Sequence, residues 1–404
     1  MSKLNDLITK LCLGGVQYRK LDEVAEIKRG RRVVKKELSQ DSNSGYPVYQ
    51  NSLKPLGYHT CSNEKAGTPF VIAAGSAGEI GYSDVDYWGA DDCYSIECDD
   101  NTVNGRYIYH VLLLKQGRIK SQVRRASIPR LSSTAIRHLE IPVPPIEVQH
   151  EVVRILDSFT ELEAELEAEL ADRKKQYEYF RGRLLDDKNL ERMDGEPVET
   201  KKLGDVSRVF GGYAFKSKEY TVSGARVMRI SDVQAGYISN ENAKYCPIDQ
   251  PKQADSARLF ANDLLVSLTG NVGRVAMVDN TVLPAYLNQR VAGLRATDAI
   301  NYRFLFHYLN QHQFIADCER AGKGSAQKNL SMGYLTNYEI PVPSIATQKR
   351  VVDILDRFDA LTTSLTDGIP AEIAMRREQY EYYRSRLLDF PRLPEDSDSD
   401  GNVE

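Results

Sequence analysis

The chain of 404 residues carries 53 lysines and arginines against 57 aspartates and glutamates, and 41% of its residues are hydrophobic. This composition is typical of a globular protein with several domains. No apolar run approaches the roughly 20 residues of a transmembrane helix, and no secretion signal begins the chain, so we expect a cytoplasmic protein without membrane contact. The six cysteines form no CxxC pair, and a formal net charge of −4 argues against nucleic acid unless the charges are unevenly distributed.

The first segment, residues 1–143, is predicted to be a strand-rich domain. The apolar run Val71–Ala74 ends in a glycine turn and is typical of a buried strand, whereas the apolar spacing of Arg106–Lys115 predicts a helix. Six of the nine residues from 28 to 36 are basic, and no acidic residue occurs from Asn101 to Leu139. Either run alone fits a solvated surface as well as an anion-binding face, but together they favour the latter. The candidate DNA contacts here are Lys28, Arg29, Arg31, Arg32, Lys35, Arg124, Arg125 and Arg130.

A long helix is predicted for residues 144–190. Pro144 and Pro145 mark its start, because proline is tolerated only in the first turn of a helix. From Val152 onward apolar residues recur every three or four positions, the pattern of a coiled coil or a long bundle helix. The tetrad Leu-Glu-Ala-Glu occurs twice in residues 162–169, and a helix from Ile146 to Asp186 would be about 60 Å long.

The sequence repeats itself. Glu140–Pro144 recurs as Glu339–Pro343, and ordered identities continue through both following helices. The chain is therefore a tandem duplication with two variable and two conserved segments. We predict a first domain at 1–143, a first helix at 144–190, a second domain at 191–342, a second helix at 343–390 and an acidic tail at 391–404.

The second variable segment has fewer basic residues but matching places. Leu264–Leu268 reads as a buried strand and precedes the turn Gly270–Gly273. A polar loop without acidic residues follows later and corresponds to residues 124–130 of the first copy. Its glycines either shape turns or let the backbone approach a groove closely. The candidate DNA contacts here are Arg274, Lys323, Gln327, Lys328 and Asn329.

The two long helices are expected to pack against each other. A single helix of this length cannot bury its apolar stripe, and the other copy is a natural antiparallel partner; alternatively, each helix docks on its own domain. Gly368 and Pro370 should interrupt the second helix. The fold class is then α+β, with two strand-rich domains joined by an antiparallel coiled coil in a pseudo-two-fold repeat. The candidate helix and partner contacts are Phe159, Leu162, Leu166, Tyr177, Phe180, Phe358, Leu361, Tyr380 and Tyr383.

Motifs of catalysis are absent from the sequence. It contains no phosphate-binding GxxxxGK[ST], no dinucleotide fingerprint, no [Asp/Asn]-Pro-Pro-[Tyr/Phe] of amino-group methyltransferases and no zinc-spaced His/Cys cluster. Two modules on a long helical spacer without such a motif indicate a binding and assembly protein rather than an enzyme, with neither a metal nor a cofactor of its own.

This layout resembles the specificity subunit of type I restriction–modification systems. The repeated Glu-Ile-Pro-Val-Pro entry to a long helix, the Gln-Tyr-Glu-Tyr and Arg-x-Arg-Leu-Leu-Asp exit and the tetrads carry the resemblance. It implies that each variable segment is a target-recognition domain for one half of a split double-stranded DNA sequence. It also implies that the helices dock two methyltransferase subunits, which hold S-adenosylmethionine, and that motor-nuclease subunits can join them.

Two alternatives remain at this point: a coiled-coil scaffold without DNA specificity, and an enzyme with an unfamiliar nuclease site. Unlike modules beside near-identical helices favour recognition over a scaffold. The charge distribution also permits DNA, because residues 146–190 and the tail from Pro391 are acidic, whereas the rest of the chain is mildly basic.

Overall fold

The computed structural model describes residues 2–99, 101–248, 252–322, 328–364 and 366–394. The chain divides into two compact units, and each draws on both repeats. Unit 1 comprises Met1–Glu167 together with Glu372–Glu404, and unit 2 comprises Ala168–Ala371.

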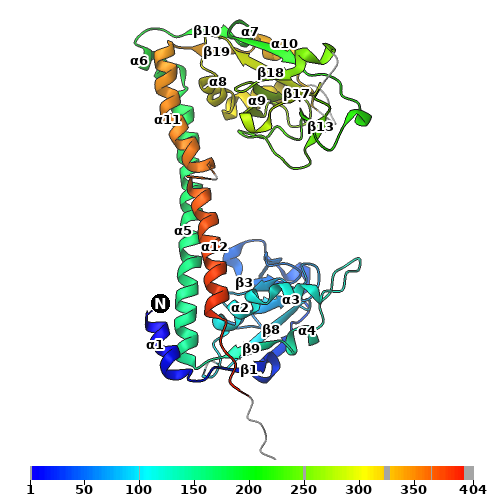
Figure 1. Ribbon diagram of the computed structural model, residues 1–404, viewed down its shortest axis with the longest axis vertical. Helices are drawn as coiled ribbons and strands as arrows, with labels where there is room; N and C mark the ends of the chain where they lie inside the picture. The colour runs from blue at the N-terminus through cyan, green and yellow to red at the C-terminus, as the bar shows by residue number, and fades with distance from the viewer. Residues whose placement is uncertain (1, 100, 249–251, 323–327, 365, 395–404) are drawn as a thin grey trace, which may run out of the picture. The chain divides into compact units, whose positions relative to one another are not determined.

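Unit 1 contains the first variable domain with one helix from each repeat (Figure 1). Its helices are α1 (Ser2–Leu11), α2 (Gly105–Leu114), α3 (Gln116–Ser121), α4 (Thr134–Arg137), the first part of α5 (Ile146–Leu184) and nearly all of α12 (Ile369–Leu387). Its strands are β1 (Gln17–Lys20), β2 (Ala25–Arg29), β3 (Tyr46–Tyr49), β4 (Gly57–His59), β5 (Phe70–Ile72), β6 (Ile80–Gly81), β7 (Trp88–Gly89), β8 (Cys93–Cys98) and β9 (Glu140–Val143).

Unit 2 repeats this plan. Its helices are the last part of α5, α6 (Asp187–Asp194), α7 (Leu203–Val206), α8 (Tyr302–Leu309), α9 (His312–Ala321), α10 (Met332–Asn337) and α11 (Ile345–Thr363). Its strands are β10 (Glu199–Lys202), β11 (Ser207–Gly211), β12 (Ala225–Met228), β13 (Lys244–Cys246), β14 (Arg258–Leu259), β15 (Leu264–Ser267), β16 (Val275–Met277), β17 (Ala285–Leu287), β18 (Val291–Ala296) and β19 (Glu339–Val342).

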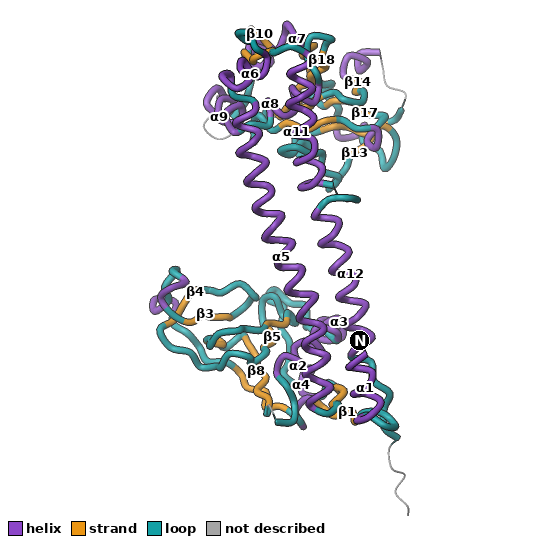
Figure 2. Tube along the Cα trace, turned by 90° about the vertical axis from the view of Figure 1, so that its left-hand side faces the viewer, coloured by secondary structure: helices purple, strands orange, loops and turns teal. Residues whose placement is uncertain are grey.

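The main sheet and the two-stranded ribbon have the same topology in both units. The antiparallel sheet β2-β8-β5-β6 of unit 1 corresponds to β11-β18-β15-β16 of unit 2, and the ribbon β1-β9 corresponds to β10-β19. A second sheet, β4-β3-β7 in unit 1 and β13-β12-β17-β14 in unit 2, includes one parallel strand pair in each case. In unit 1, strands β3 and β4 lie far from α5 (Figure 2). The strands predicted near Val71–Ala74 and Leu264–Leu268 are confirmed as β5 and β15.

The conserved helices begin and break where the sequence indicates. α5 starts directly after Pro145, and α11 starts after Ser344, whose side chain accepts from the Thr347 amide. The predicted interruption is confirmed between α11 and α12. At Gly368 the chain passes so close to the end of α11 that a Cβ would lie 2.7 Å from the Ala360 carbonyl oxygen.

Within each unit, helices of the two repeats pack together in opposite directions. In unit 1 the ring of Phe159 on α5 stacks on Tyr383 of α12 at 5.2 Å between centroids, and Arg377 of α12 bonds Glu167 of α5. In unit 2 the ring of Phe358 on α11 stacks on Phe180 of α5 at 5.4 Å. The core of unit 1 accordingly includes Tyr380, Leu387, Leu388 and Phe390 from the second repeat, and that of unit 2 includes Tyr177, Leu185 and Leu190 from the first.

Candidate nucleic-acid interface

One end of the four-stranded sheet gathers the loops in each unit, and we call this end the loop edge. In unit 1, β2 ends there at Arg29, β8 begins at Cys93 and β5 ends at Ile72, since Arg29 pairs with Tyr94 and Ile72 with Cys93. The turn Gly75–Gly78 joins β5 to β6 at the same end. Gly75 and Gly78 have positive φ angles, which only glycine adopts without strain.

The basic segment 124–130 folds onto this loop edge as a short hairpin. Arg124 and Arg130 exchange backbone hydrogen bonds, and the Gly75 amide donates to the Pro129 carbonyl at 3.2 Å. The Leu131 amide continues the contact by donating to the Ala73 carbonyl at 2.8 Å. The structure thus brings together the glycine turn and the basic loop, which lie about 50 residues apart in the sequence.

Unit 2 builds its loop edge with the same backbone contacts. The Gly270 amide donates to the Lys328 carbonyl at 3.0 Å, and the Leu330 amide donates to the Leu268 carbonyl at 2.8 Å. These bonds match those of Gly75 and Leu131 in unit 1. The two turns and their loops are therefore equivalent.

The charges on the two loop edges differ at equivalent positions. The Glu79 carbonyl accepts from the amide of Ile72 in unit 1, and the Arg274 carbonyl accepts from Ser267 in unit 2, so these residues correspond. By the same criterion Asp92, bonded to the Ala73 amide, corresponds to Arg290, bonded to the Leu268 amide. A shared backbone thus presents different side chains in the two units.

The predicted basic residues of unit 1 fall into two groups. Lys28 is paired with Glu26 and Glu97, whose hydrogen bond raises the pKa of the lysine, and Arg29 donates from Nε to the Asp91 carbonyl at 2.9 Å. The other group is exposed and, among the described residues, its side chains have no hydrogen-bond or ion-pair partner: Arg31, Arg32, Lys35, Arg124, Arg125 and Arg130. This second group is free to contact an anionic ligand.

The predicted residues of unit 2 are held more firmly. Arg274 is half-buried and donates from Nη1 to Gln234 Oε1 at 2.6 Å, and Asn329 accepts from the Thr269 hydroxyl at 3.0 Å. Lys328 forms an ion pair with Glu319, with 3.6 Å between Nζ and Oε2. Lys323 and Gln327 lie outside the described residues.

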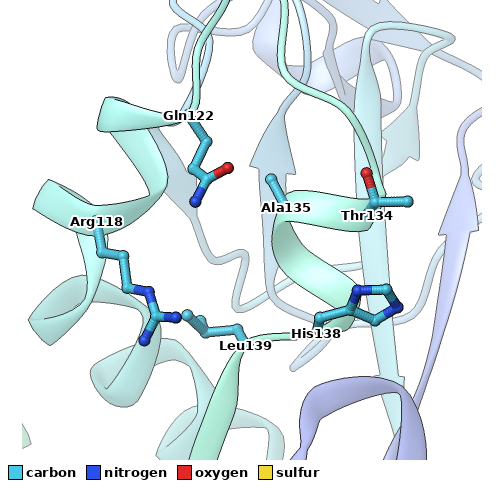
Figure 3. Close-up of a pocket in the computed structure, with 6 residues that line it drawn as sticks. All are labelled: Arg118, Gln122, Thr134, Ala135, His138 and Leu139. Carbon is cyan, nitrogen blue, oxygen red and sulfur yellow. The ribbon is translucent and has the colours of Figure 1, made fainter.

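A polar cavity of about 270 Å³ lies between α3 and α4 in unit 1. Arg118 and Gln122 reach into it from α3 and its C-terminal cap, and Thr134 and His138 belong to α4 and its cap (Figure 3). In unit 2 the repeat places Tyr334 and Tyr338 where unit 1 has Ala135 and Leu139, at an offset of 199 residues. Ala135 and Leu139 have smaller side chains than these tyrosines, and sequence reasoning did not single out the residues that line the cavity.

The helix residues predicted from the apolar stripe differ in exposure. Tyr177 and Tyr380 are buried, and each hydroxyl bonds a buried histidine of a variable domain. Leu162, Phe180 and Leu361 are exposed by 43%, 40% and 37%. Phe159, Leu166, Phe358 and Tyr383 are half-buried.

Sequence reasoning also passed over the histidines that Tyr177 and Tyr380 contact. His110 and His307 make no motif of their own, but they lie 197 residues apart, close to the repeat offset. That correspondence is the signal that could have found them.

Two further statements hold for residues 2–394 apart from the undescribed gaps. No helix in this part of the chain is both long and apolar enough to span a bilayer. No group of three or more His, Cys, Asp or Glu side chains in the same part could hold a metal ion.

The domain model described as "type I restriction modification DNA specificity domain" matches this chain twice, at residues 14–172 and 195–375. The two matches cover most of both repeats. The chain belongs to this family. It is a DNA specificity subunit of a restriction–modification system, a non-catalytic component, which confirms that interpretation over a scaffold or a nuclease.

Individual relatives agree with this assignment. The specificity subunit of the Escherichia coli type I restriction enzyme EcoR124I/EcoR124II is 33% identical over 307 residues, which cover 73% of each chain. A putative type I restriction enzyme specificity subunit of Haemophilus influenzae is 30% identical and covers 96% of this chain and 100% of its own. The crystal structure of a type I S subunit from M. genitalium has the same fold, with a TM-score of 0.58 at 17% identity over 93% of this chain and 96% of that one.

Proposed function

We propose that each unit reads one half of a split double-stranded DNA target through its loop edge. The observation that carries the proposal is that equivalent backbone positions carry unlike charges. Glu79 and Asp92 of unit 1 occupy the positions that Arg274 and Arg290 occupy in unit 2. Arginine side chains on loops both hold phosphates and read base edges, whereas carboxylates accept only from base amino groups. Two loop edges with different side chains therefore suit two different half-sites.

The exposed basic group of unit 1 supplies the phosphate contacts in this proposal. Arg31, Arg32 and Arg125 are exposed and unpaired among the described residues, so binding DNA breaks no ion pair.

The conserved helices dock the other subunits in this proposal. Two methyltransferase subunits, which carry S-adenosylmethionine, bind the complex, and motor-nuclease subunits can join them. The exposed hydrophobic side chains Leu162 and Phe180 on α5 and Leu361 on α11 support such docking, because large exposed hydrophobic groups mark interaction surfaces. The chain itself then holds no cofactor.

The test is to co-express the chain with its cognate methyltransferase and to map the methylated adenines. We expect a split motif with a fixed gap. Arg31→Glu combined with Arg32→Glu should weaken binding to the mapped duplex at least about tenfold, because two phosphate contacts become repulsive. Co-purification with the methyltransferase should remain unchanged.

The matched control is Arg19→Glu with Lys20→Glu, an adjacent basic pair on β1 in the same unit, near the start of β2 and away from the loop edge. It changes the net charge equally, so an equal loss of affinity would indicate bulk charge rather than a contact. A contiguous motif would contradict the proposal of one half-site per unit.

A further inference from the structure

A buried histidine ties the variable domain of unit 1 to both of its long helices. His110 on α2 is fully buried. Its Nε2 lies 2.8 Å from Asp157 Oδ1 on α5, and its Nδ1 lies 3.0 Å from the Tyr380 hydroxyl on α12. One ring thus bonds one helix from each repeat.

Unit 2 contains the same arrangement. His307 on α8 is fully buried, with Nε2 2.7 Å from Asp356 Oδ1 on α11 and Nδ1 2.9 Å from the Tyr177 hydroxyl on α5. In both units the aspartate comes from the helix that follows the domain, and the tyrosine comes from the other repeat. We call each set of histidine, aspartate and tyrosine a histidine link.

The directions of the hydrogen bonds in the link follow from charge. Burial lowers the pKa of His110 despite the hydrogen bond with Asp157, so the ring is neutral. Burial opposes ionisation of Asp157, but hydrogen bonds from His110 and Arg106 hold its pKa below the ordinary value. A carboxylate only accepts, so Nε2 of the neutral ring carries the proton and Nδ1 accepts from the tyrosine hydroxyl. His307 and Asp356 shift in the same directions.

Beside the link, Arg106 of α2 also donates to Asp157, and the Asn104 amide donates to Gln149 of α5. The other contacts between the domain and the helices are mainly apolar. Val148, Val152 and Leu156 of α5 are buried in the core of unit 1 together with Leu387 of α12. Apolar burial has no preferred direction, so such a contact tolerates small rotations, whereas a hydrogen bond weakens steeply when its angle changes. The link therefore supplies directional contacts between domain and helix pair.

We propose that the histidine link fixes the orientation of each variable domain on its helix pair, and thereby the gap between the two half-sites. The inference rests on the proposed function, in which each unit reads one half-site. The gap then depends on two polar links as well as on the length of the helices. Tyr177 and Tyr380 act as positioning residues, since they touch the histidines and not the DNA.

The test removes only the tyrosine hydroxyl. Tyr380→Phe and Tyr177→Phe keep the ring in the core and delete one hydrogen bond each. Methylation rates are measured on duplexes with the mapped gap and with gaps one base pair shorter or longer. We expect the preference for the mapped gap to fall about two- to tenfold in each variant, and further in the double variant.

Each variant has a control on the same helix. Tyr382 and Tyr179 lie two residues beyond the linked tyrosines, are more than half exposed, and accept from Arg386 and Arg183 at 2.7 and 3.1 Å. Tyr382→Phe and Tyr179→Phe should leave the gap preference unchanged.

A second pair of variants distinguishes the loss of the hydrogen bonds from a loss of folding. His110→Gln keeps a donor and an acceptor and should retain most of the gap preference, whereas His110→Leu should lose it. A merely structural defect would slow methylation of duplexes with every gap equally and leave the gap preference unchanged. If the wild type methylates a split motif and the Tyr→Phe variants keep the same gap preference, the role proposed for the histidine link is wrong but the proposed function stands. A contiguous wild-type motif overturns both the link and the proposed function.

Discussion

The two units carry different side chains at their loop edges. They carry the same buried polar side chains on the helix-facing side, where each variable domain packs on its long helices. At the loop edge, Glu79 is replaced by Arg274 although the surrounding backbone bonds are the same. On the helix-facing side the buried polar side chains that join domain and helices are the same in both units. Gln149 and Gln348 are both fully buried. Each accepts a hydrogen bond from the amide of the residue at the N-cap of a domain helix, α2 or α8, and donates to a proline carbonyl at 2.8 Å.

The difference follows from burial. A buried polar side chain must find its partners inside the protein, so changing one member of a network leaves the others unsatisfied. Glu79 and Arg274 at the loop edge are half-buried and bond Lys120 and Gln234, but water can replace such a partner, so these side chains can change at little cost to the fold. The buried polar contacts thus keep the packing of each domain on its helices the same in both units. The side chains of the loop edge can differ, so each domain can bind a different ligand.

The largest expected effect comes from breaking the repeated side. Asp157→Ala removes the carboxylate that accepts from the half-buried Arg106 and the buried His110. We expect the free energy of unfolding of unit 1 to fall by about 2–4 kcal/mol, less than for a fully buried ion pair because Asp157 is 26% exposed, in urea denaturation followed by circular dichroism. Asp356→Ala should cost unit 2 a similar amount.

The control for both is Glu161→Ala, an exposed carboxylate on α5 without a described partner, which should change stability by less than about 0.5 kcal/mol. If Asp157→Ala and Asp356→Ala lower the free energy of unfolding by clearly different amounts, the domain–helix contacts of the two units are alike in geometry but not in energy.

A smaller effect is expected at the loop edge of unit 2. Arg274→Glu reverses the charge to that of its counterpart Glu79 and removes the bond to Gln234. We expect affinity for the mapped duplex to fall by about 1–3 kcal/mol, the usual value of a specific arginine contact, with little change in stability. Fluorescence anisotropy at two salt concentrations measures the loss.

Arg208→Glu is the matched control, because Arg208 is exposed at the start of β11, at the opposite end of the same sheet. If Arg208→Glu and Arg274→Glu weaken binding equally, the loop edge has no special role, and the comparison between exposed and buried sides loses its functional meaning.

Local patterns explain what could be predicted from the sequence. The repeat, the strand at Leu264–Leu268, the helix at Arg106–Lys115 and the break near Gly368 all follow from residues that are neighbours in the chain. The contact of the Gly75 turn with residues 124–130 does not, because it is made by backbone groups that carry no sequence signature.

The histidine link escaped for another reason. His110, Asp157 and Tyr380 lie on three helices, and Tyr380 belongs to the other repeat, so no spacing within one segment joins them. Ion pairing separates the basic residues in a way that the sequence does not show: Lys28 and Arg31 belong to the same basic run, but only Lys28 lies between two glutamates.

The smallest expected effect concerns a helix position where the two supports differ. Glu151 of α5 is buried between Arg154 and Lys3, whereas the equivalent residue of α11, Arg350, donates to the Met193 carbonyl. Hydrogen bonds from Arg154 and Lys3 lower the pKa of Glu151 to about 2. A carboxyl whose pKa is lower in the folded state stabilises it above the unfolded pKa of about 4.5, and this contribution is lost as the pH falls toward 2.

Lys3→Ala should therefore destabilise unit 1 by less than about 1 kcal/mol at pH 7, because Lys3 is 72% exposed and its attraction is screened. The difference from wild type should shrink between pH 4.5 and pH 2, where Glu151 becomes protonated in both proteins. Lys10→Ala, at the exposed end of the same helix, should have no such pH dependence. Urea denaturation of the three proteins at several pH values measures this; a cost of Lys3→Ala that persists at pH 2 would assign the role of Lys3 to packing of α1 rather than to its charge.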